Sequence, residues 1–262
     1  MRADLERWNA RYGGEFTASF LPHPLAERAL ALPLPDGPVL ELACGPSGTV
    51  LLAAASGRRV VAVDISDVAL SMLRARVRAQ RPTGRVAIVQ ADLDTWRPRV
   101  ASFALVLCTG YWDRPLFSAA ARAVLPGGLI GWEALTTRML RHRPGMPASW
   151  CVRPGEPASL LPDGYQVLCE EELPSDGPAT RRRLLARAAR NAADCKPMVL
   201  LEREDWQVAG SGAARGCPDR PDRRLPDQQA GAAGHAREDQ GQARRAGRLD
   251  CLDAAPAAHG SG

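Results

Sequence analysis

The chain has 262 residues and carries 34 basic and 29 acidic side chains, a net charge of +5. This length suits one large domain or two small ones. No stretch approaches the roughly 18 consecutive apolar residues of a membrane-spanning helix, and the N-terminus lacks the apolar run of a signal peptide. We therefore expect neither a membrane-spanning nor a secreted protein.

The basic excess and the cysteines indicate no polyanion site, disulfide framework or metal. All basic residues except Lys196 are arginine, and they cluster only at residues 181–183, so we expect no nucleic-acid partner. The 7 cysteines are widely spaced without a CxxC pair, and the 4 histidines have no partner at metal-ligand spacing. We expect no bound metal and reduced thiols, which predict a cytoplasmic protein.

Apolar runs alternate with amphipathic stretches over residues 1–188. The apolar runs predict strands over residues 38–44, 59–65, 85–91, 102–109, 127–135, 165–173 and 181–188. The stretches between them predict helices over residues 47–56, 66–80 and 114–125, with Ser66 as a helix cap. Repeated strand–helix units imply an α/β, Rossmann-like fold, in which a seven-stranded, mainly parallel sheet carries helices on both faces and ends in an antiparallel hairpin.

The chain changes character near residue 189. Past Trp206 few large apolar residues remain, and the rest has no periodicity. Such a segment cannot bury enough surface to offset its conformational entropy. We therefore predict a domain over residues 1–188 and a low-complexity, disordered tail over 189–262. A reading-frame shift near residue 188 explains the tail equally well.

Glycines follow the first predicted strand. Glu41 lies in that strand, which runs into a turn containing Gly45 and Gly48. Without side chains, these glycines let the backbone approach a ligand closely. In an open α/β sheet, ligands bind at the carboxyl ends of the strands, where this turn falls.

Acidic residues end the next two predicted strands. Asp64 ends the second strand, and its carboxylate suits the two hydroxyls of a ribose. Asp92 ends the third strand, where it suits an adenine amino group while Leu93 packs against the ring. Together with the glycine turn, this order predicts a cofactor that contains adenosine.

Three motifs resemble those of the class I S-adenosylmethionine-dependent methyltransferases, namely residues 39–45 (VLELACG), 61–66 (VAVDIS) and 91–93 (ADL). The resemblance covers roughly residues 8–188 and implies S-adenosylmethionine as the cofactor. It implies cofactor contacts from Glu41, Ala43, Gly45, Gly48, Asp64, Ile65, Asp92, Leu93 and Cys108.

The glycine turn departs from the pattern of that class. Pro46 and Ser47 separate Gly45 from Gly48, and Ala43 occupies a glycine position. A nicotinamide-dependent enzyme fits less well, because no glycine follows before Gly57 and Pro46 removes a backbone donor that a diphosphate needs.

The N-terminal segment resembles that of one subgroup within this class. Trp8, Arg11 and Tyr12, with residues 92–96 (DLDTW), are similar to the tellurite-resistance and thiopurine methyltransferase-like group. The resemblance suggests an N-terminal lid in which Arg11 contacts a carboxylate. An ordinary amphipathic helix that covers the sheet is the alternative.

The resemblance places the methyl acceptor beside the loop that follows residues 102–109. There Tyr111 and Trp112 suit stacking on a flat or apolar acceptor, and Asp113 suits a general base. The alternative is that the aromatic side chains pack a lid and Asp113 caps the helix from Arg114. The loop lacks the Asn/Asp-Pro-Pro-Tyr/Phe motif of enzymes that methylate planar amino nitrogens, which weakens a nucleic-acid substrate.

We therefore predict S-adenosylmethionine-dependent methyl transfer to a small-molecule acceptor, at sulfur, oxygen or a metalloid oxyanion. A non-catalytic S-adenosylmethionine-fold protein that binds a partner through its tail is the alternative. The sequence leaves the acceptor and the oligomeric state open.

Overall fold

The computed structural model describes residues 2–14, 16–82, 84–173 and 180–190. The predicted tail falls outside these residues from position 191 onward. Among the described helices, none has both the length and the apolar character needed to cross a membrane.

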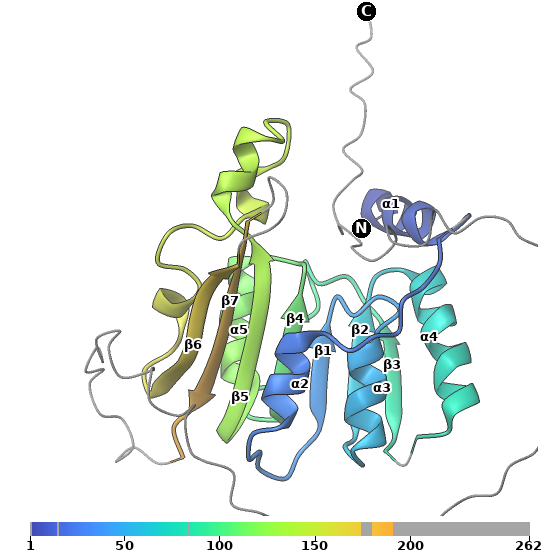
Figure 1. Cartoon of the computed structure of the whole chain (residues 1–262), viewed down its shortest axis with the longest axis horizontal. Coiled ribbons are helices and arrows are strands. Elements are labelled where there is room, and N and C mark those ends of the chain that lie inside the picture. The colour runs from blue at the N-terminus through green and yellow to red at the C-terminus, as the bar shows by residue number, and fades with distance from the viewer. Residues whose placement is uncertain (1, 15, 83, 174–179, 191–262) are drawn as a thin grey trace, which may run out of the picture. The chain divides into compact units, whose positions relative to one another are not determined.

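Seven strands form one sheet, which confirms the predicted fold class (Figure 1). Their order is β3-β2-β1-β4-β5-β7-β6. Strands β1 to β5 are parallel to their neighbours, whereas β7 runs antiparallel to both β5 and β6. The strands are β1 (Val39–Leu42), β2 (Val60–Asp64), β3 (Val86–Gln90), β4 (Phe103–Thr109), β5 (Val124–Leu135), β6 (Tyr165–Leu173) and β7 (Arg181–Ala188).

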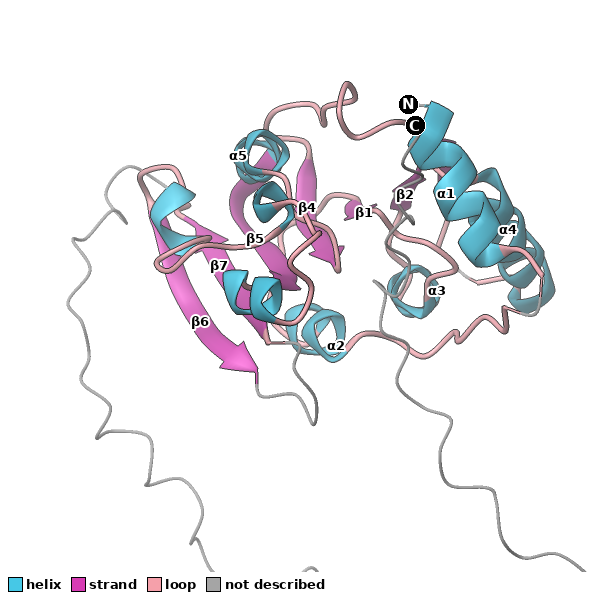
Figure 2. Ribbon diagram, turned by 90° about the horizontal axis from the view of Figure 1, so that it is seen from above, coloured by secondary structure: helices cyan, strands magenta, loops and turns pink. Residues whose placement is uncertain are grey.

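Helices cover both faces of the sheet (Figure 2). Helix α5 packs on one face, and α2 and α3 pack on the other. The helices are α1 (Arg2–Tyr12), α2 (Pro24–Leu30), α3 (Gly48–Ala55), α4 (Asp67–Gln80) and α5 (Arg114–Ala123). Three short 3-10 turns follow β5, namely η1 (Thr137–Arg141), η2 (Ala148–Trp150) and η3 (Ala158–Leu160).

Side-chain caps begin the helices that follow the strands. The Ser47 hydroxyl accepts the N–H of Val50, and the Ser66 hydroxyl accepts the N–H of Ala69, each at 3.1 Å. Such a cap satisfies a helix N–H that has no partner within the helix and stabilises the helix by about 1 kcal/mol. The predicted cap at Ser66 is thus confirmed.

Alternating strand residues divide the core between the two faces. Leu40 and Leu42 of β1 pack on the α5 side, whereas Val39 packs on the α2 side. The predicted helix 114–125 extends too far, because Val124 already pairs with Phe103 as the start of β5. Because β1 pairs in parallel with β2 and β4, the carboxyl ends of these three strands lie at one edge of the sheet, where polar residues gather.

Candidate active site

Asp64 joins the ends of β1 and β2. One oxygen of its carboxylate accepts the N–H of Gly45 and the other accepts the N–H of Ser66, both at 2.8 Å. The end of β3 lies beside it, since the N–H of Ala91 donates to the Asp64 carbonyl at 2.9 Å. The structure therefore brings the predicted strand ends at residues 45, 64 and 92 to one edge of the sheet.

Glu41 is a second buried carboxylate at this edge. It is 4 % exposed and accepts the Ser47 hydroxyl at 2.7 Å. Burial raises its pKa to about 8, and the charge of Asp64 contributes to the rise. Burial also raises the pKa of Asp64 itself. Among the described residues, neither carboxylate forms an ion pair with a side chain of this protein, so the edge suits a cationic ligand.

The turn after β1 bends through backbone conformations that favour glycine. Ala43 has φ of 49° and Gly45 has φ of 54°. The left-handed region costs a residue with a side chain about 1–2 kcal/mol. Alanine at position 43, which the sequence pattern identifies as a glycine position, therefore strains the turn.

The two glycines of the turn serve different purposes. A Cβ on Gly45 would lie 2.9 Å from the Tyr12 hydroxyl, so this glycine faces the edge and the helix above it. A Cβ on Gly48 would lie 2.3 Å from the Phe20 carbonyl oxygen and 2.4 Å from the Leu21 carbonyl carbon. The space at Gly48 is therefore filled by the N-terminal segment instead of lying open to a ligand, as the sequence had suggested.

The remaining predicted cofactor residues lie at or just below the same edge. Asp92 accepts the N–H of Asp94 at 2.9 Å and so shapes its own turn. Leu93 and Cys108 are buried in the core cluster on the α5 side. The carbonyl of Ile65 accepts the Gln90 amide at 3.1 Å. These contacts hold Ile65 and Asp92 at the carboxyl ends of neighbouring strands.

The loop after β4 differs from its predicted role. Trp112 is 3 % exposed and packs against Phe117 and Trp132, so its ring belongs to the core and not to an exposed stacking surface. Asp113 accepts the N–H of Leu116 at 2.7 Å and caps α5, as the alternative for this residue proposed. Tyr111 is partly buried, and burial raises the pKa of its phenol, which keeps the phenol protonated and unable to act as a base.

Helix α1 covers the glycine turn. Tyr12, whose hydroxyl lies next to Gly45, stacks on Trp8 with ring centroids 6.0 Å apart. Asn9 donates to the Asp67 carboxylate at 2.6 Å and accepts the Ser66 hydroxyl at 2.7 Å. Arg11 lies on the same helix. Sequence reasoning found three residues of this helix but missed Asn9, whose only signal was its place between Trp8 and Tyr12.

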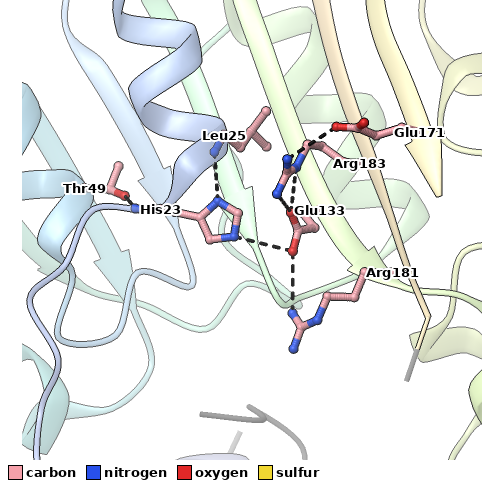
Figure 3. A network of polar contacts seen from close by, with 7 residues as sticks. All are labelled: His23, Leu25, Thr49, Glu133, Glu171, Arg181 and Arg183. Atoms are coloured by element: carbon pink, nitrogen blue, oxygen red, sulfur yellow. Dashed lines mark hydrogen bonds and ion pairs between the residues drawn. The ribbon is translucent and has the colours of Figure 1, made fainter. Parts of the chain in front are cut away.

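The sequence also did not predict a polar network at the end of β5 (Figure 3). The Nδ1 atom of His23 accepts the N–H of Leu25 at 3.2 Å, so the proton of the neutral ring lies on Nε2, 3.4 Å from Glu133. Arg183 donates from Nε to Glu133 at 2.8 Å, and its Nη2 atom lies 2.8 Å from the same carboxylate oxygen as an ion pair. Arg181 lies 3.9 Å from the same carboxylate.

Glu133 is the centre of this network. Burial raises its pKa, but the hydrogen bonds from His23 and Arg183, together with the charge of Arg183, outweigh burial and hold the pKa below its usual value. The Glu133 carbonyl also accepts the N–H of Gly110 at 2.7 Å. The network therefore connects the segment before α2 with the loop after β4. Its sequence signal was the arginine cluster at residues 181–183, which had suggested no site.

Comparison with known proteins agrees with this geometry. Residues 39–128 match the family model described as a methyltransferase domain. Magnesium protoporphyrin IX methyltransferase from Synechocystis PCC 6803, solved with bound SAH, is 15% identical with a TM-score of 0.52, over 71% of this chain and 95% of that one. An S-adenosylmethionine-dependent methyltransferase from Mesorhizobium loti is 19% identical with a TM-score of 0.50, over 63% and 96%.

The [4+2]-cyclase SpnF is equally similar in fold, with 15% identity and a TM-score of 0.50 over 64% of this chain and 79% of that one. At these identities the solved structures show the fold alone. No curated protein sequence matches the chain.

The strand order and the match over residues 39–128 agree with a methyltransferase domain of the Rossmann-like α/β type. Residues 39–128 carry a methyltransferase domain.

Proposed function

We propose that the chain transfers a methyl group from S-adenosylmethionine to a small-molecule acceptor at sulfur, oxygen or a metalloid oxyanion. The observation that carries this proposal is the pair of buried carboxylates, Glu41 and Asp64, on either side of the glycine turn. The ammonium and sulfonium groups of S-adenosylmethionine are cations, and buried carboxylates attract cations strongly. The residues present therefore fit the cofactor.

Each predicted cofactor residue has a place in this proposal. The nucleoside is held by Asp64, Ile65, Asp92 and Leu93 at the ends of β2 and β3. The methionine part lies along Glu41, Ala43, Gly45 and Cys108 at the ends of β1 and β4. Gly48 acts indirectly, because it lets residues 20–21 pack against the first turn of α3.

When bound, S-adenosylmethionine supplies a methyl group that is already activated. The protein must then align the acceptor with the carbon–sulfur bond and exclude water, and alignment of this kind supplies about 7–11 kcal/mol. Tyr12 and Trp8 cover the glycine turn from above and exclude water there. Asp94 fixes the Tyr111 hydroxyl at 3.4 Å, which orients the loop that faces the acceptor.

The same loop favours an acceptor that needs little help from a base. Asp113 is occupied as a helix cap, and the raised pKa of Tyr111 keeps its phenol protonated. A thiol, with a pKa near 8.5, loses its proton readily, whereas an alcohol requires a base. Sulfur is therefore the acceptor atom that this loop suits best. It also fits the resemblance to the tellurite-resistance and thiopurine group, which remains a prediction.

A non-catalytic binding protein is the second candidate, and the strained turn at Ala43 favours it. The interaction tail of that candidate lies outside the described residues. The cytoplasmic location also remains a prediction.

Two measurements on the full chain separate these functions. Calorimetry with S-adenosylhomocysteine tests whether the cofactor site binds. A transfer assay with methyl-labelled S-adenosylmethionine, over thiols, selenite, tellurite and phenols, tests catalysis. Binding together with labelled product from one acceptor class supports the enzyme. Binding without product from any class favours the second candidate, and the absence of binding contradicts the enzyme.

A further inference from the structure

Four side chains form a row from the glycine turn to the segment after β5. Tyr12 lies next to Gly45 and stacks on Trp8. The Arg7 guanidinium carbon lies 5.7 Å from the centre of the Trp8 ring and 5.0 Å from that of Trp150. Both distances fall within the range in which a cation and an aromatic ring attract each other. The row links α1 to η2, although the two elements lie far apart in the sequence.

The α1 end of this row is loosely attached. No residue of α1 is buried, so little apolar surface holds the helix down. Its tertiary contacts include the Asn9 hydrogen bonds to Ser66 and Asp67, the rings above Gly45 and the Arg7 contact with Trp150. Gly14 follows the helix with φ of 63°, and nothing lies within 4 Å of a Cβ added there, so no packing holds the chain at this point.

The Trp150 end is firmly attached. The next residue, Cys151, is fully buried with Leu135 and Met139. Val152 donates its N–H to the Leu135 carbonyl at 2.8 Å and accepts the N–H of Thr137 at 3.1 Å. These bonds anchor the segment on the end of β5. Trp150 itself remains 40% exposed, although a ring of this size usually loses more of its surface on folding.

Arg7 is oriented toward this ring by its own helix. Asp4, one turn earlier, lies 2.6 Å from Arg7 Nη2. The ion pair limits the freedom of the guanidinium, so less entropy is lost when it meets the indole.

We propose that Arg7 and Trp150 form a clasp that closes α1 over the bound cofactor. A firm anchor and a loosely held helix meet at this contact, and the helix carries Tyr12 to the glycine turn. Opening the clasp lifts Tyr12 from Gly45 and frees the route by which the cofactor leaves. Arg7 and Trp150 are thus positioning residues that set how long the cofactor stays. This inference rests on the proposed function, because it assumes that the cofactor binds at the glycine turn.

The test measures the dissociation rate of S-adenosylhomocysteine from the full chain by stopped-flow competition. The contact is partly exposed, so Arg7→Ala and Trp150→Leu should each speed dissociation about two- to fivefold. Trp150→Phe, which keeps an aromatic ring, should restore a rate near that of the unchanged protein. The double variant should dissociate no faster than the faster single variant, because both changes remove the same contact. Arg2→Ala is the matched control, since Arg2 is on the same helix and pairs with exposed Glu6.

A second measurement does not need the cofactor. Trypsin cleavage after Arg11, a site that every variant keeps, should be faster in Arg7→Ala and Trp150→Leu than in Arg2→Ala. Equal cleavage rates and equal dissociation rates in all variants would overturn the clasp. A double variant whose increase in dissociation rate is the product of the two single increases would also overturn it. If the unchanged protein fails to bind S-adenosylhomocysteine, the proposed function fails. The cleavage rates then still decide whether the contact holds α1 down.

Discussion

The Asp64 carboxylate accepts the backbone N–H of Gly45 at 2.8 Å, so the end of β2 holds the turn that follows β1. Its second oxygen holds the backbone of Ser66 in the same way. Each carboxylate oxygen can accept a further hydrogen bond, which leaves capacity for a ribose hydroxyl. Asp64 therefore shapes the site before any ligand reaches it.

Replacing Asp64 should weaken both binding and folding. Asp64→Ala removes a charged acceptor, and we expect a loss of about 1–3 kcal/mol in the binding free energy of S-adenosylhomocysteine, measured by calorimetry. The free energy of unfolding in urea should also fall, because two buried N–H groups lose their partner. Asp36→Asn, in the loop before β1, is the control. A folded Asp64→Ala protein with unchanged affinity would remove Asp64 from the site.

Glu41 should make stability depend on pH. Burial raises its pKa to about 8 from a usual value of 4.5, so between these values the folded protein holds a proton that the unfolded chain has released. The stabilisation is fully present below about pH 4.5, and it is lost as the pH rises through about 8. In thermal unfolding from pH 5 to 9, Glu41→Gln should therefore flatten the decline with rising pH. The exposed Glu27→Gln should leave the decline unchanged, and identical curves for all three proteins would contradict this account.

Binding of the cofactor should release the proton that Glu41 holds in the folded protein. A cation beside Glu41 favours the charged carboxylate and lowers its pKa, so binding near pH 7 should release protons. Calorimetry with S-adenosylmethionine in two buffers of different ionisation heat measures that release. In Glu41→Gln, the binding heats in the two buffers should agree more closely than they do in the unchanged protein.

Gly48 should be a packing position. Gly48→Ala places a Cβ 2.3–2.5 Å from backbone atoms of Phe20 and Leu21, which cannot move as a side-chain tip can. We expect this overpacking to lower the free energy of unfolding in urea by roughly 1–3 kcal/mol. Gly145→Ala is the matched control, because nothing lies within 4 Å of its added Cβ. Equal stability of the two variants would show that residues 20–21 do not pack there.

Gly48 also shows how far the sequence can predict the site. The glycine spacing, the carboxylates at the strand ends and the strand pattern all follow from local chemistry, and the structure brings them to one edge. The contact that fills Gly48 comes from Phe20 and Leu21, which precede the first strand, and no local pattern announces such a contact. The prediction that Trp112 offers an exposed stacking surface failed for a related reason. A strand end predicts exposure, but Phe117 of the next helix and Trp132 of the next strand enclose this ring.

Replacing Ala43 with glycine should relieve backbone strain in the turn after β1. Its φ of 49° strains an alanine, and Ala43→Gly should raise the free energy of unfolding by roughly 0.5–1 kcal/mol, once the greater freedom of glycine in the unfolded chain is subtracted from the relief of strain. Ala55→Gly, at the exposed end of α3, should instead lower it by a similar amount. Urea unfolding measures both. Destabilisation by Ala43→Gly would mean that the turn is relaxed as it stands.

His23 should contribute through two separable contacts. His23→Asn keeps an acceptor for the first turn of α2 but cannot reach Glu133, so it should cost about 0.5–1.5 kcal/mol. His23→Gln reaches toward Glu133 but caps the helix poorly, so it should cost about 1 kcal/mol. His23→Ala removes both contacts and should cost about the sum of the two losses, measured by urea unfolding. If His23→Ala costs no more than either single loss, the two contacts do not act independently, and His23 does not bridge α2 and β5 in the way that Figure 3 shows.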